Sequence, residues 1–300
     1  MKHEKPSDKL FIQIASHAGG NTSKIPINVS RFPSGEVNVV LPVEELEKQM
    51  ACMSNDEPVT AVVHSVMLNS DDVMLTLLAA SAVWNFFKKS NLPPLLDTQL
   101  TAPYLPYSRQ DRICHEGEAF SLAVMVNLFG MAGYDSVITD DLHSNVIDNI
   151  YTEYVISVAP YGFYQKVAKA VLKKEGVATN ICWCLPDKGA VAKFTSFEES
   201  NPNTKLQKII ASKTRTADGL TSTLIKKPGY LHNDIPIIVV DDICDGGATF
   251  IELAKVLNDE FPHNRLYLSV THGFFTKGLD ELREYYSGIY SKFNYTTYTE

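Results

Sequence analysis

The 300-residue sequence lacks several features that would each place a chain in a particular class of protein. Cysteines number five, an odd and scattered set, which favours a reducing compartment over a framework of disulfide bonds. Cys182 and Cys184 lie two positions apart in an apolar run, so we expect core packing rather than a metal site. No stretch reaches the roughly 18 apolar residues of a membrane-spanning helix, and the N-terminus shows no signal-peptide pattern. These absences predict a cytoplasmic protein (in the host's cytoplasm if the source is a virus) with no membrane partner.

Positively charged residues are also fewer than negatively charged ones. Lys and Arg number 27 against 35 Asp and Glu, which gives a net charge of −8. Because nucleic-acid binding requires a basic surface, this balance argues against a nucleic-acid partner. It does not argue against a phosphorylated small molecule, since a few local Lys and Arg side chains can form a positive pocket on an acidic protein.

The overall composition is typical of a globular protein with a sizeable core. Hydrophobic residues make up 45% of the chain and charged residues 21%, and the length favours two domains. Strand patterns alternate with helix patterns, and this alternation occurs twice, which predicts an α/β fold with two mainly parallel sheets flanked by helices. The boundary is expected between Tyr151 and Ala159, which gives domains 1–156 and 157–300.

The expected elements follow from apolar periodicity and turn residues. Strands or extended runs are expected at Leu10–Ala15, Val59–Val66, Leu95–Tyr107, Ser136–Leu142, Thr179–Leu185, Leu206–Ala211, Leu220–Ile225, Ile237–Val240 and Leu266–Val270. A turn is expected at His17–Asn21, and a hairpin at Val29–Val43. Helices are expected at Asp71–Phe87 (capped by Ser70 or Asp71), Ala119–Met131, Tyr161–Lys174, Gly189–Phe197, Phe250–Leu257 and Leu279–Tyr286.

The most informative stretch is Ile237–Leu257. Asp241 and Asp242 stand where a buried strand is expected to end, and the small-residue loop Asp245–Thr249 leads into a helix. Free backbone N–H groups and the helix dipole make such a turn an anion site, and two nearby acids can accept hydrogen bonds from a sugar diol. The glycines are followed by no Gly-Lys-Ser/Thr, and Gly-x-Gly-x-x-Gly is absent, so neither common nucleotide loop applies. We interpret the stretch as a sugar-phosphate cradle; a plain strand–helix unit with surface acids is the alternative.

Acidic residues end strands in both halves of the chain. In parallel sheets, ligands bind beyond the carboxyl ends of the strands. A carboxylate and a histidine beside bound phosphates suit Mg²⁺, which keeps several waters and takes one or two protein ligands. His143 and Asp187 are the candidates here, the alternatives being a capping or buried histidine and a turn residue. The full set is Asp140, Asp141 and His143, then Asp187, then Asp241, Asp242 and Asp245.

Three further segments carry side chains suited to a nucleotide. The guanidinium groups of Arg109–Arg112 can hold a polyphosphate by bidentate contacts. Lys213 and Arg215, on what we expect to be a mobile loop, could close over a charged transition state. In the hairpin, Phe32, Ser34 and Glu36 could stack on a base and form hydrogen bonds with it. Taken singly, each segment is more often a solvated loop or a plain turn.

Taken together, these segments resemble the ribose-phosphate pyrophosphokinase (phosphoribosyl-pyrophosphate synthetase) family, and they occur in the family's order between Leu10 and Gly273. The similar segments are R-F-P-S-G-E at Arg31–Glu36, P-Y-S-R-Q-D-R at Pro106–Arg112, T-D-D-L-H at Thr139–His143, L-P-D-K-G-A at Leu185–Ala190, S-K-T-R at Ser212–Arg215 and V-V-D-D-I-C-D-G-G-A-T at Val239–Thr249. The resemblance implies two type I phosphoribosyltransferase-like domains, one carrying the ATP segments and the other the remaining motifs.

The resemblance also implies an activity. The diphosphoryl group of ATP would pass to O1 of ribose 5-phosphate, giving phosphoribosyl pyrophosphate (PRPP) and AMP, with Mg²⁺ as cofactor. Such a transferase would feed purine, pyrimidine and NAD biosynthesis and would form a homodimer or homohexamer.

The resemblance assigns a role to each candidate residue. ATP would be bound by Phe32, Ser34, Glu36, Arg109, Gln110, Asp111 and His143. Ribose 5-phosphate would be bound by Asp241, Asp242, Asp245, Gly246, Gly247, Ala248 and Thr249. Metal would be held by His143 and Asp187, and catalysis would depend on Lys213 and Arg215.

The chain departs from the family pattern in several places. Ile113–Gly117 lacks the family's basic residues, so the usual regulation by phosphate or ADP is in doubt, and Thr214 replaces the middle cation of the catalytic loop. Gly246 replaces a Thr, which predicts a weaker hold on the 5-phosphate. The helix after Asn21 is missing, and the C-terminus is shorter.

Two other functions stay open at the level of sequence. A type I phosphoribosyltransferase would use the same cradle to consume PRPP, but it usually has one such domain and no ATP segments. A non-catalytic, synthetase-like regulatory subunit is the second, and the presence together of Lys213, Arg215, His143 and Asp187 argues against it.

Overall fold

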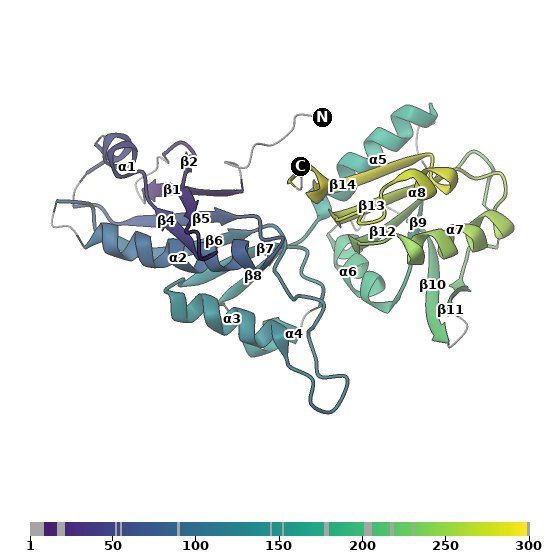
Figure 1. Cartoon of the computed structure of the whole chain (residues 1–300). Helices are drawn as coiled ribbons and strands as arrows, with labels where there is room; N and C mark the ends of the chain where they lie inside the picture. The colour runs from purple at the N-terminus through teal and green to yellow at the C-terminus, as the bar shows by residue number, and fades with distance from the viewer. Residues whose placement is uncertain are drawn as a thin grey trace. The chain divides into compact units, whose positions relative to one another are not determined.

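The computed structural model describes residues 9–298 except 17–21, 52, 55, 89–90, 145, 152, 177–179, 201–205, 217–218 and 230. The chain forms two compact units, Met1–Val158 and Ala159–Glu300, and each is described by itself. Each unit contains a six-stranded sheet flanked by helices (Figure 1). Among the described helices, none has the length and apolar character needed to cross a membrane.

The first unit has a sheet in which the strands follow the order β2-β1-β5-β6-β7-β8. Strands β5 to β8 run parallel, whereas β1 pairs antiparallel with both β2 and β5. The strands are β1 (Leu10–Ser16), β2 (Ile25–Pro26), β5 (Val59–Ser65), β6 (Leu95–Ala102), β7 (Ser136–Asp140) and β8 (Val155–Val158). The helices are α1 (Val43–Met50), α2 (Ser70–Phe87), α3 (Ser121–Ala132) and α4 (Val146–Ile150). A separate antiparallel pair, β3 (Asn28–Arg31) and β4 (Val37–Val40), forms the predicted hairpin.

The helices of this unit begin and end at residues suited to those positions. The α2 helix is capped by Asn69, whose Oδ1 accepts a hydrogen bond from Asp72 N at 3.0 Å, so the predicted caps one or two residues later were wrong. The α3 helix ends as predicted at Gly133, which has a φ of 107°.

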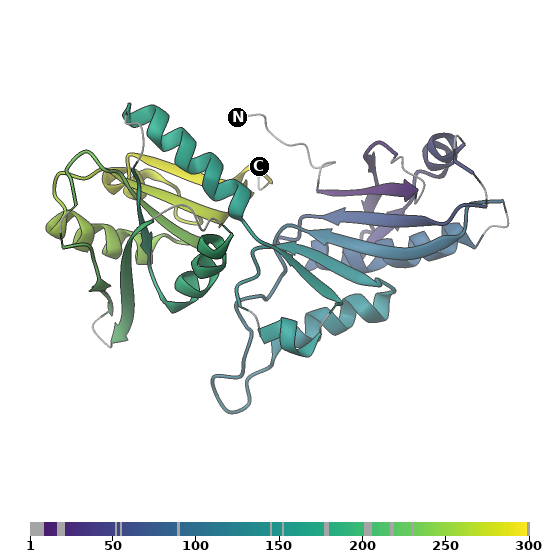
Figure 2. The ribbon, with the colours of Figure 1, turned by 180° about the vertical axis from the view of Figure 1, so that it is seen from behind.

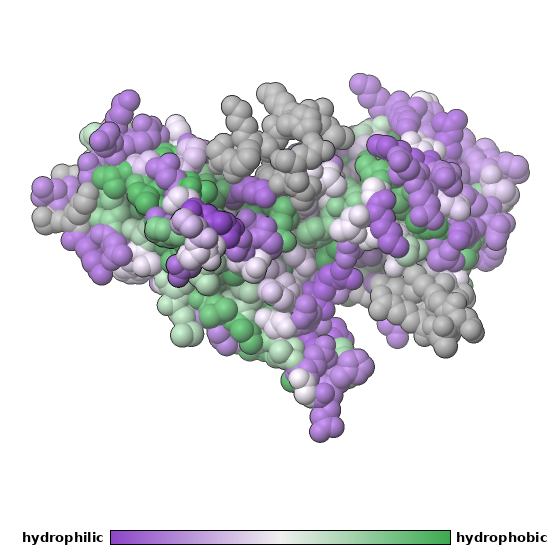
Figure 3. Space-filling view, in the orientation of Figure 1, coloured by the Kyte–Doolittle hydropathy of each residue, from purple (hydrophilic) through white to green (hydrophobic). Residues whose placement is uncertain are grey.

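The α3 helix also presents apolar side chains to solvent. Val124, Leu128 and Met131 are 54%, 37% and 85% exposed. Figure 3 shows hydrophobic surface over α3. Exposed apolar patches of this kind often mark contact surfaces. The homodimer or homohexamer expected from the resemblance stays a prediction, for which this face offers apolar area.

The second unit has the strand order β11-β10-β9-β12-β13-β14. Its central strands are parallel, and β10 and β11 form an antiparallel pair at one edge. The strands are β9 (Cys182–Leu185), β10 (Gln207–Thr216), β11 (Gly219–Lys226), β12 (Ile237–Cys244), β13 (Leu266–Gly273) and β14 (Gly288–Asn294). The helices are α5 (Tyr161–Glu175), α6 (Lys188–Glu199), α7 (Ala248–Glu260) and α8 (Asp280–Tyr285), with a 3₁₀ turn η2 at Tyr295–Tyr298.

Both faces of this second sheet are buried. Trp183 and Leu185 pack with α5 and α6, while Cys182 and Cys184 pack on the opposite face with α7 and α8 (Figures 1 and 2). The two cysteines are therefore core residues, as predicted. Burial on both faces explains why β9 and the first half of β12 appear in the sequence as continuous apolar runs.

The elements that the sequence misplaced are short, polar or extended by pairing. Strand β10 was expected to end at Ala211 and β12 at Val240, yet pairing with β11 and β13 extends them to Thr216 and Cys244. The sequence also missed β2, β8, β14, α1 and α4; β8, for instance, has only four residues, three of them exposed. The turn expected at His17–Asn21 lies outside the described residues.

Candidate functional site

The hairpin of the first unit holds the side chains predicted to bind a base. Its turn is closed by hydrogen bonds from Phe32 N to Glu36 O and from Gly35 N to Phe32 O, each 2.8 Å long. Gly35 has a φ of 97°, a conformation that favours glycine. The Phe32 ring is 54% exposed, and Ser34 Oγ donates to Glu36 Oε2 at 2.9 Å. The hairpin therefore presents an aromatic face and polar groups together to solvent.

Arg31 connects this hairpin to the neighbouring helix. Its guanidinium group donates to Gly35 O at 2.7 Å and forms an ion pair with Asp71 in the first turn of α2. The sequence offered Asp71 only as a possible helix cap. Its partner lies 40 residues away along the chain, so the local pattern could not identify this contact.

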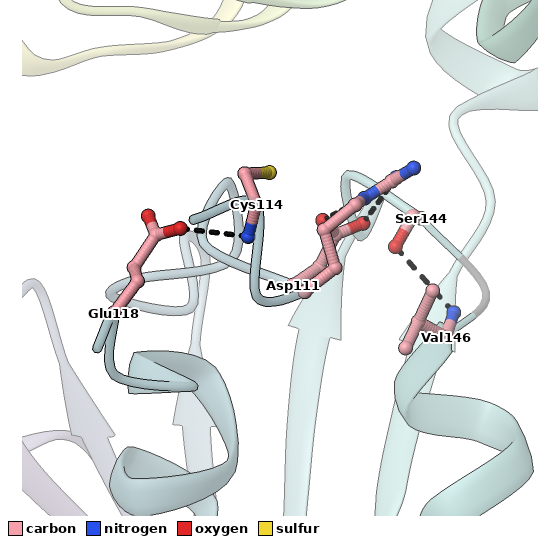
Figure 4. Close-up of polar contacts among 6 residues, drawn as sticks. Asp111, Cys114, Glu118, Ser144 and Val146 are labelled. Carbon is pink, nitrogen blue, oxygen red and sulfur yellow. Dashed lines mark hydrogen bonds and ion pairs between the residues drawn. The ribbon is translucent and has the colours of Figure 1, made fainter. Parts of the chain in front are cut away.

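Asp111 is the centre of a polar cluster in the same unit. Its buried carboxylate accepts two hydrogen bonds from Arg112, from Nε at 2.8 Å and from Nη2 at 3.0 Å. The hydrogen bond from Arg112 lowers the pKa of Asp111, burial opposes that change, and a hydrogen bond from Ser144 and the charge of His143 lower it further. Figure 4 shows Asp111 and Ser144 on adjacent loops. Asp111 therefore joins the Arg109–Arg112 segment to the loop that carries His143.

The loop after Arg112 closes on itself. Glu118 Oε2 accepts a backbone hydrogen bond from Cys114 N at 2.7 Å (Figure 4) and another from His115 N at 3.0 Å, and these contacts lower the pKa of the Glu118 carboxyl. Gly117 completes the turn with a φ of 81°. An acidic side chain thus organises the segment in which the resemblance would lead us to expect basic residues.

The loop that carries His143 is anchored to strand β8. Asp141 is buried with a φ of 45°, and its N–H donates to Val158 O at 3.0 Å. Leu142 N donates to Ser157 Oγ, also at 3.0 Å. These bonds hold the half-buried His143 just beyond the carboxyl end of β7, at the edge where ligands bind in parallel sheets.

In the second unit, Asp187 caps helix α6. Its Oδ1 accepts a hydrogen bond from Ala190 N at 3.0 Å, and a side chain at Gly189 would approach the same oxygen to 3.2 Å. The carboxylate therefore has a structural role in starting the helix. Its position after β9 also places it at the carboxyl edge of the second sheet, where its predicted role in metal binding stays a prediction.

Asp241 and Asp242 lie within β12 rather than beyond its end, contrary to the expectation from sequence. Successive strand residues face opposite sides of a sheet, so Asp242 continues the face of Ile238 and Val240, which α6 covers. There its buried Oδ2 lies 3.2 Å from Nζ of Lys193. Asp241 Oδ1 accepts a hydrogen bond from Asp242 N at 2.9 Å.

Lys193 contacts the candidate sugar site, although the sequence did not identify it as a candidate. It lies on α6 at helical spacing from Ala190 and Phe197, which are both buried. A lysine on the inward face of a helix indicates a buried carboxylate partner, and that signal was available in the sequence.

The loop between β12 and α7 leads into the N-terminus of a helix, as predicted, and its role as an anion cradle stays a prediction. Gly247 caps α7 with a φ of 82°, and its backbone N–H lies against the buried Cys244 thiol. Burial, with the charges of Asp241 and Asp245, raises the pKa of Cys244 to about 12. The thiol is therefore protonated at neutral pH and takes no part as a nucleophile.

The segment after β13 packs beside this loop. A Cβ at Gly246 would lie 3.5 Å from both Cδ and Cε of Lys277. Thr276 reaches the same loop through two hydrogen bonds to Asp245, from N to the backbone oxygen at 3.0 Å and from Oγ1 to Oδ1 at 2.8 Å. Neither Lys277 nor Thr276 was a candidate from sequence, because both follow a different strand.

Lys213 and Arg215 belong to β10, in register with Ser222 and Leu220 of β11. The backbone there is a paired strand rather than the loop expected from sequence. The positions of these two side chains lie outside the described residues.

The described residues contain no cluster of three or more His, Cys, Asp or Glu side chains that could hold a metal. His143 lies in the first unit and Asp187 in the second. Mg²⁺ usually keeps several waters and is bound by one or two protein ligands together with substrate phosphates. The metal-binding roles of His143 and Asp187 stay predictions.

Comparisons with known proteins reveal distant relatives across most of the chain. No family model matches it. The chain is 24% identical over 263 residues to ribose-phosphate pyrophosphokinase of Thermococcus kodakarensis, covering 86% of this chain and 81% of that protein. It is 26% identical over 266 residues to the Pyrococcus abyssi enzyme of the same name, covering 86% and 79%.

One solved structure matches both units. Phosphoribosylpyrophosphate synthetase from Mycobacterium smegmatis has a TM-score of 0.62 at 18% identity, covering 84% of this chain and 74% of that one. This match and the observed strand order confirm the predicted fold, with two mainly parallel sheets flanked by helices in a type I phosphoribosyltransferase-like arrangement.

Proposed function

Because the chain is a distant homologue of ribose-phosphate pyrophosphokinases, we propose that it transfers the β,γ-diphosphoryl group of ATP to O1 of ribose 5-phosphate. The products would be PRPP and AMP. The observation that carries this proposal is the span of the similarity, which covers 263 residues and so exceeds the length of either unit. A phosphoribosyltransferase would need only the cradle of the second unit.

In the proposed reaction, the hairpin of the first unit binds the base of ATP. The exposed ring of Phe32 would stack on adenine, because an aromatic side chain at the tip of a hairpin leaves one face open. Ser34 and Glu36 would supply hydrogen-bonding partners for the edge of the base. The contacts of Arg31 with Gly35 O and Asp71 would hold the hairpin in position.

The polyphosphate of ATP would be held by the segment Arg109–Arg112. Arg109 and Gln110 are exposed, and charge-assisted hydrogen bonds from a guanidinium group suit phosphate oxygens. Asp111 would act indirectly, since its carboxylate is engaged by Arg112 and would repel phosphate if it faced it. Its contact with Ser144 would keep this segment beside His143.

The second unit would bind ribose 5-phosphate. The carboxylates of Asp241 and Asp242 would accept hydrogen bonds from the 2- and 3-hydroxyl groups. The backbone N–H groups of Asp245, Gly246, Gly247, Ala248 and Thr249, with the Thr249 hydroxyl, would surround the 5-phosphate at the start of α7.

The chemical step would be an in-line displacement at the β-phosphorus. O1 of the sugar attacks, the bond to the α-phosphate oxygen breaks, and AMP leaves. Lys213 and Arg215 would neutralise negative charge on the transferred group and the bridging oxygen, and no covalent nucleophile is required. Mg²⁺, held by His143 and Asp187, would supply further charge neutralisation on the polyphosphate when bound.

The direct test is product formation from ATP, ribose 5-phosphate and Mg²⁺. Wild-type protein should release AMP and PRPP in equal amounts, and Lys213→Ala should lower kcat by on the order of 10²-fold. Lys166→Ala, which removes an exposed lysine on α5, is the matched control and should retain full activity. Absence of both products from the wild type would overturn the proposal, and consumption of PRPP with an added base would favour a transferase.

A further inference from the structure

Lys277 lies where the sequence gave no reason to expect a cation. Its Cδ and Cε are each 3.5 Å, and its Cγ 3.7 Å, from the position that a Cβ on Gly246 would take. The aliphatic part of the lysine therefore lies across the glycine of the candidate phosphate loop. The ammonium group is one bond beyond Cε and belongs to an exposed side chain.

Hydrogen bonds hold Lys277 beside this loop. Phe274 N and Phe275 N both donate to Cys244 O, at 2.8 and 3.2 Å, and Gly278 N donates back to Phe275 O at 2.7 Å. The two bonds from Thr276 to Asp245 complete the connection. Lys277 thus sits in a tight turn, Phe275–Gly278, that is fastened to the residues preceding Gly246 on the chain.

The charges of the loop make a nearby cation useful. A sugar phosphate carries close to two negative charges at neutral pH, and the ionisable side chain of the loop itself is the acidic Asp245. Backbone N–H groups and the helix dipole attract the phosphate, but Asp245 opposes them. An ammonium group beside Gly246 would offset that repulsion and donate charge-assisted hydrogen bonds to the phosphate.

We propose that Lys277 is a binding residue for the 5-phosphate group of the sugar substrate. This inference rests on the proposed function, in which the loop binds ribose 5-phosphate. The ammonium group of Lys277 would offset the loss of a hydroxyl donor at Gly246, which the sequence predicts to weaken phosphate binding.

The test removes the positive charge of Lys277. Lys277→Met should weaken ribose 5-phosphate binding, measured by calorimetry, by roughly tenfold to a hundredfold, the loss typical of a charge-assisted contact. KM for ribose 5-phosphate should rise similarly, while KM for ATP and the weak affinity for unphosphorylated ribose should not change. Lys277→Arg should retain most of the affinity, and Lys166→Met is the matched control for loss of an exposed lysine.

The outcomes also distinguish the inference from the proposed function. Wild-type protein that neither binds ribose 5-phosphate nor forms PRPP would refute both. Wild-type protein that binds the sugar phosphate no more tightly than Lys277→Met would refute the role of Lys277 alone.

Discussion

A lysine on the inward face of a helix requires a partner of opposite charge, and Lys193 of α6 meets Asp242 of β12 at 3.2 Å. Adjacent acids such as Asp241 and Asp242 would suggest a bound cation or ligand if nothing else compensated their charge. The structure shows that Lys193 already compensates one of them. The pair therefore fixes one side chain of the candidate sugar site before any substrate arrives.

Removal of the Lys193 ammonium group should destabilise the fold. Lys193→Met would leave the buried Asp242 carboxylate without its cation, and the free energy of unfolding should fall by about 3 kcal/mol. Chemical denaturation at pH 7 would measure the loss, with Lys169→Met on the exposed face of α5 as control. If the two variants proved equally stable, the ion pair would have no structural role.

His64 gives the first unit a pH-dependent stability. Its ring stacks on Phe11 at 4.4 Å, and burial, followed by the charge of Lys24, lowers its pKa from 6.5 to about 4. The unfolded chain therefore binds a proton at higher pH than the folded chain does. The contribution is complete above pH 6.5, and the free energy of unfolding should fall as the pH is lowered from 6.5 towards 4.

Denaturation midpoints measured across this range would test the effect. His64→Gln should reduce the slope of stability against pH between those two values, because the titrating group is gone. An unchanged slope in the variant would show that other groups cause the pH dependence.

At the scale of elements, the junction between α3 and β7 depends on one glycine. Gly133 has a φ of 107°, and a Cβ there would lie 2.6 Å from Nε1 of Trp84 on α2. The same indole nitrogen donates to Gly133 O at 2.9 Å. The glycine thus ends α3 and also allows α2 and α3 to approach closely.

Gly133→Ala should lower the free energy of unfolding for two reasons. The left-handed backbone conformation should cost about 1–2 kcal/mol and the overpacking against Trp84 about 1–3 kcal/mol more. Gly176→Ala, at the end of α5, is a matched control, because its φ is 67° but no atom lies within 4 Å of the added Cβ. Thermal unfolding should show a clearly larger loss for Gly133→Ala; equal losses would mean that the indole simply moves aside.

At the scale of the whole molecule, each unit has a hydrophobic core of its own. The buried cluster of the first unit draws on residues from Leu10 to Val155, and the two clusters of the second unit lie between Tyr164 and Tyr286. A core that closes within each unit is the physical requirement for independent folding.

We therefore expect residues 1–158 and 159–300 to fold when they are produced as separate chains. Each should unfold cooperatively on heating, as monitored by circular dichroism. Under the proposed function, the first chain should retain ATP binding and the second ribose 5-phosphate binding, while neither alone forms AMP. A half that shows no cooperative transition would contradict the prediction for that unit.

The sequence alone determined much of this protein, because local patterns encode local structure. Two rounds of alternating strand and helix signals predicted two parallel sheets, and Gly133 and Gly176 marked helix ends that the structure confirms. The ordered motifs pointed to the family in which the distant relatives were then found.

Contacts between residues far apart along the chain were decided only by the tertiary structure. Pairing with β13 carries β12 past Asp241 and Asp242, and α6 brings Lys193 against Asp242. The turn after β13 places Lys277 across Gly246, so the glycine that looked like a deficiency in the sequence is a point of contact in the fold. Helical periodicity could indicate that Lys193 faces inward, but the partner of each residue depends on which strands and helices come to lie side by side.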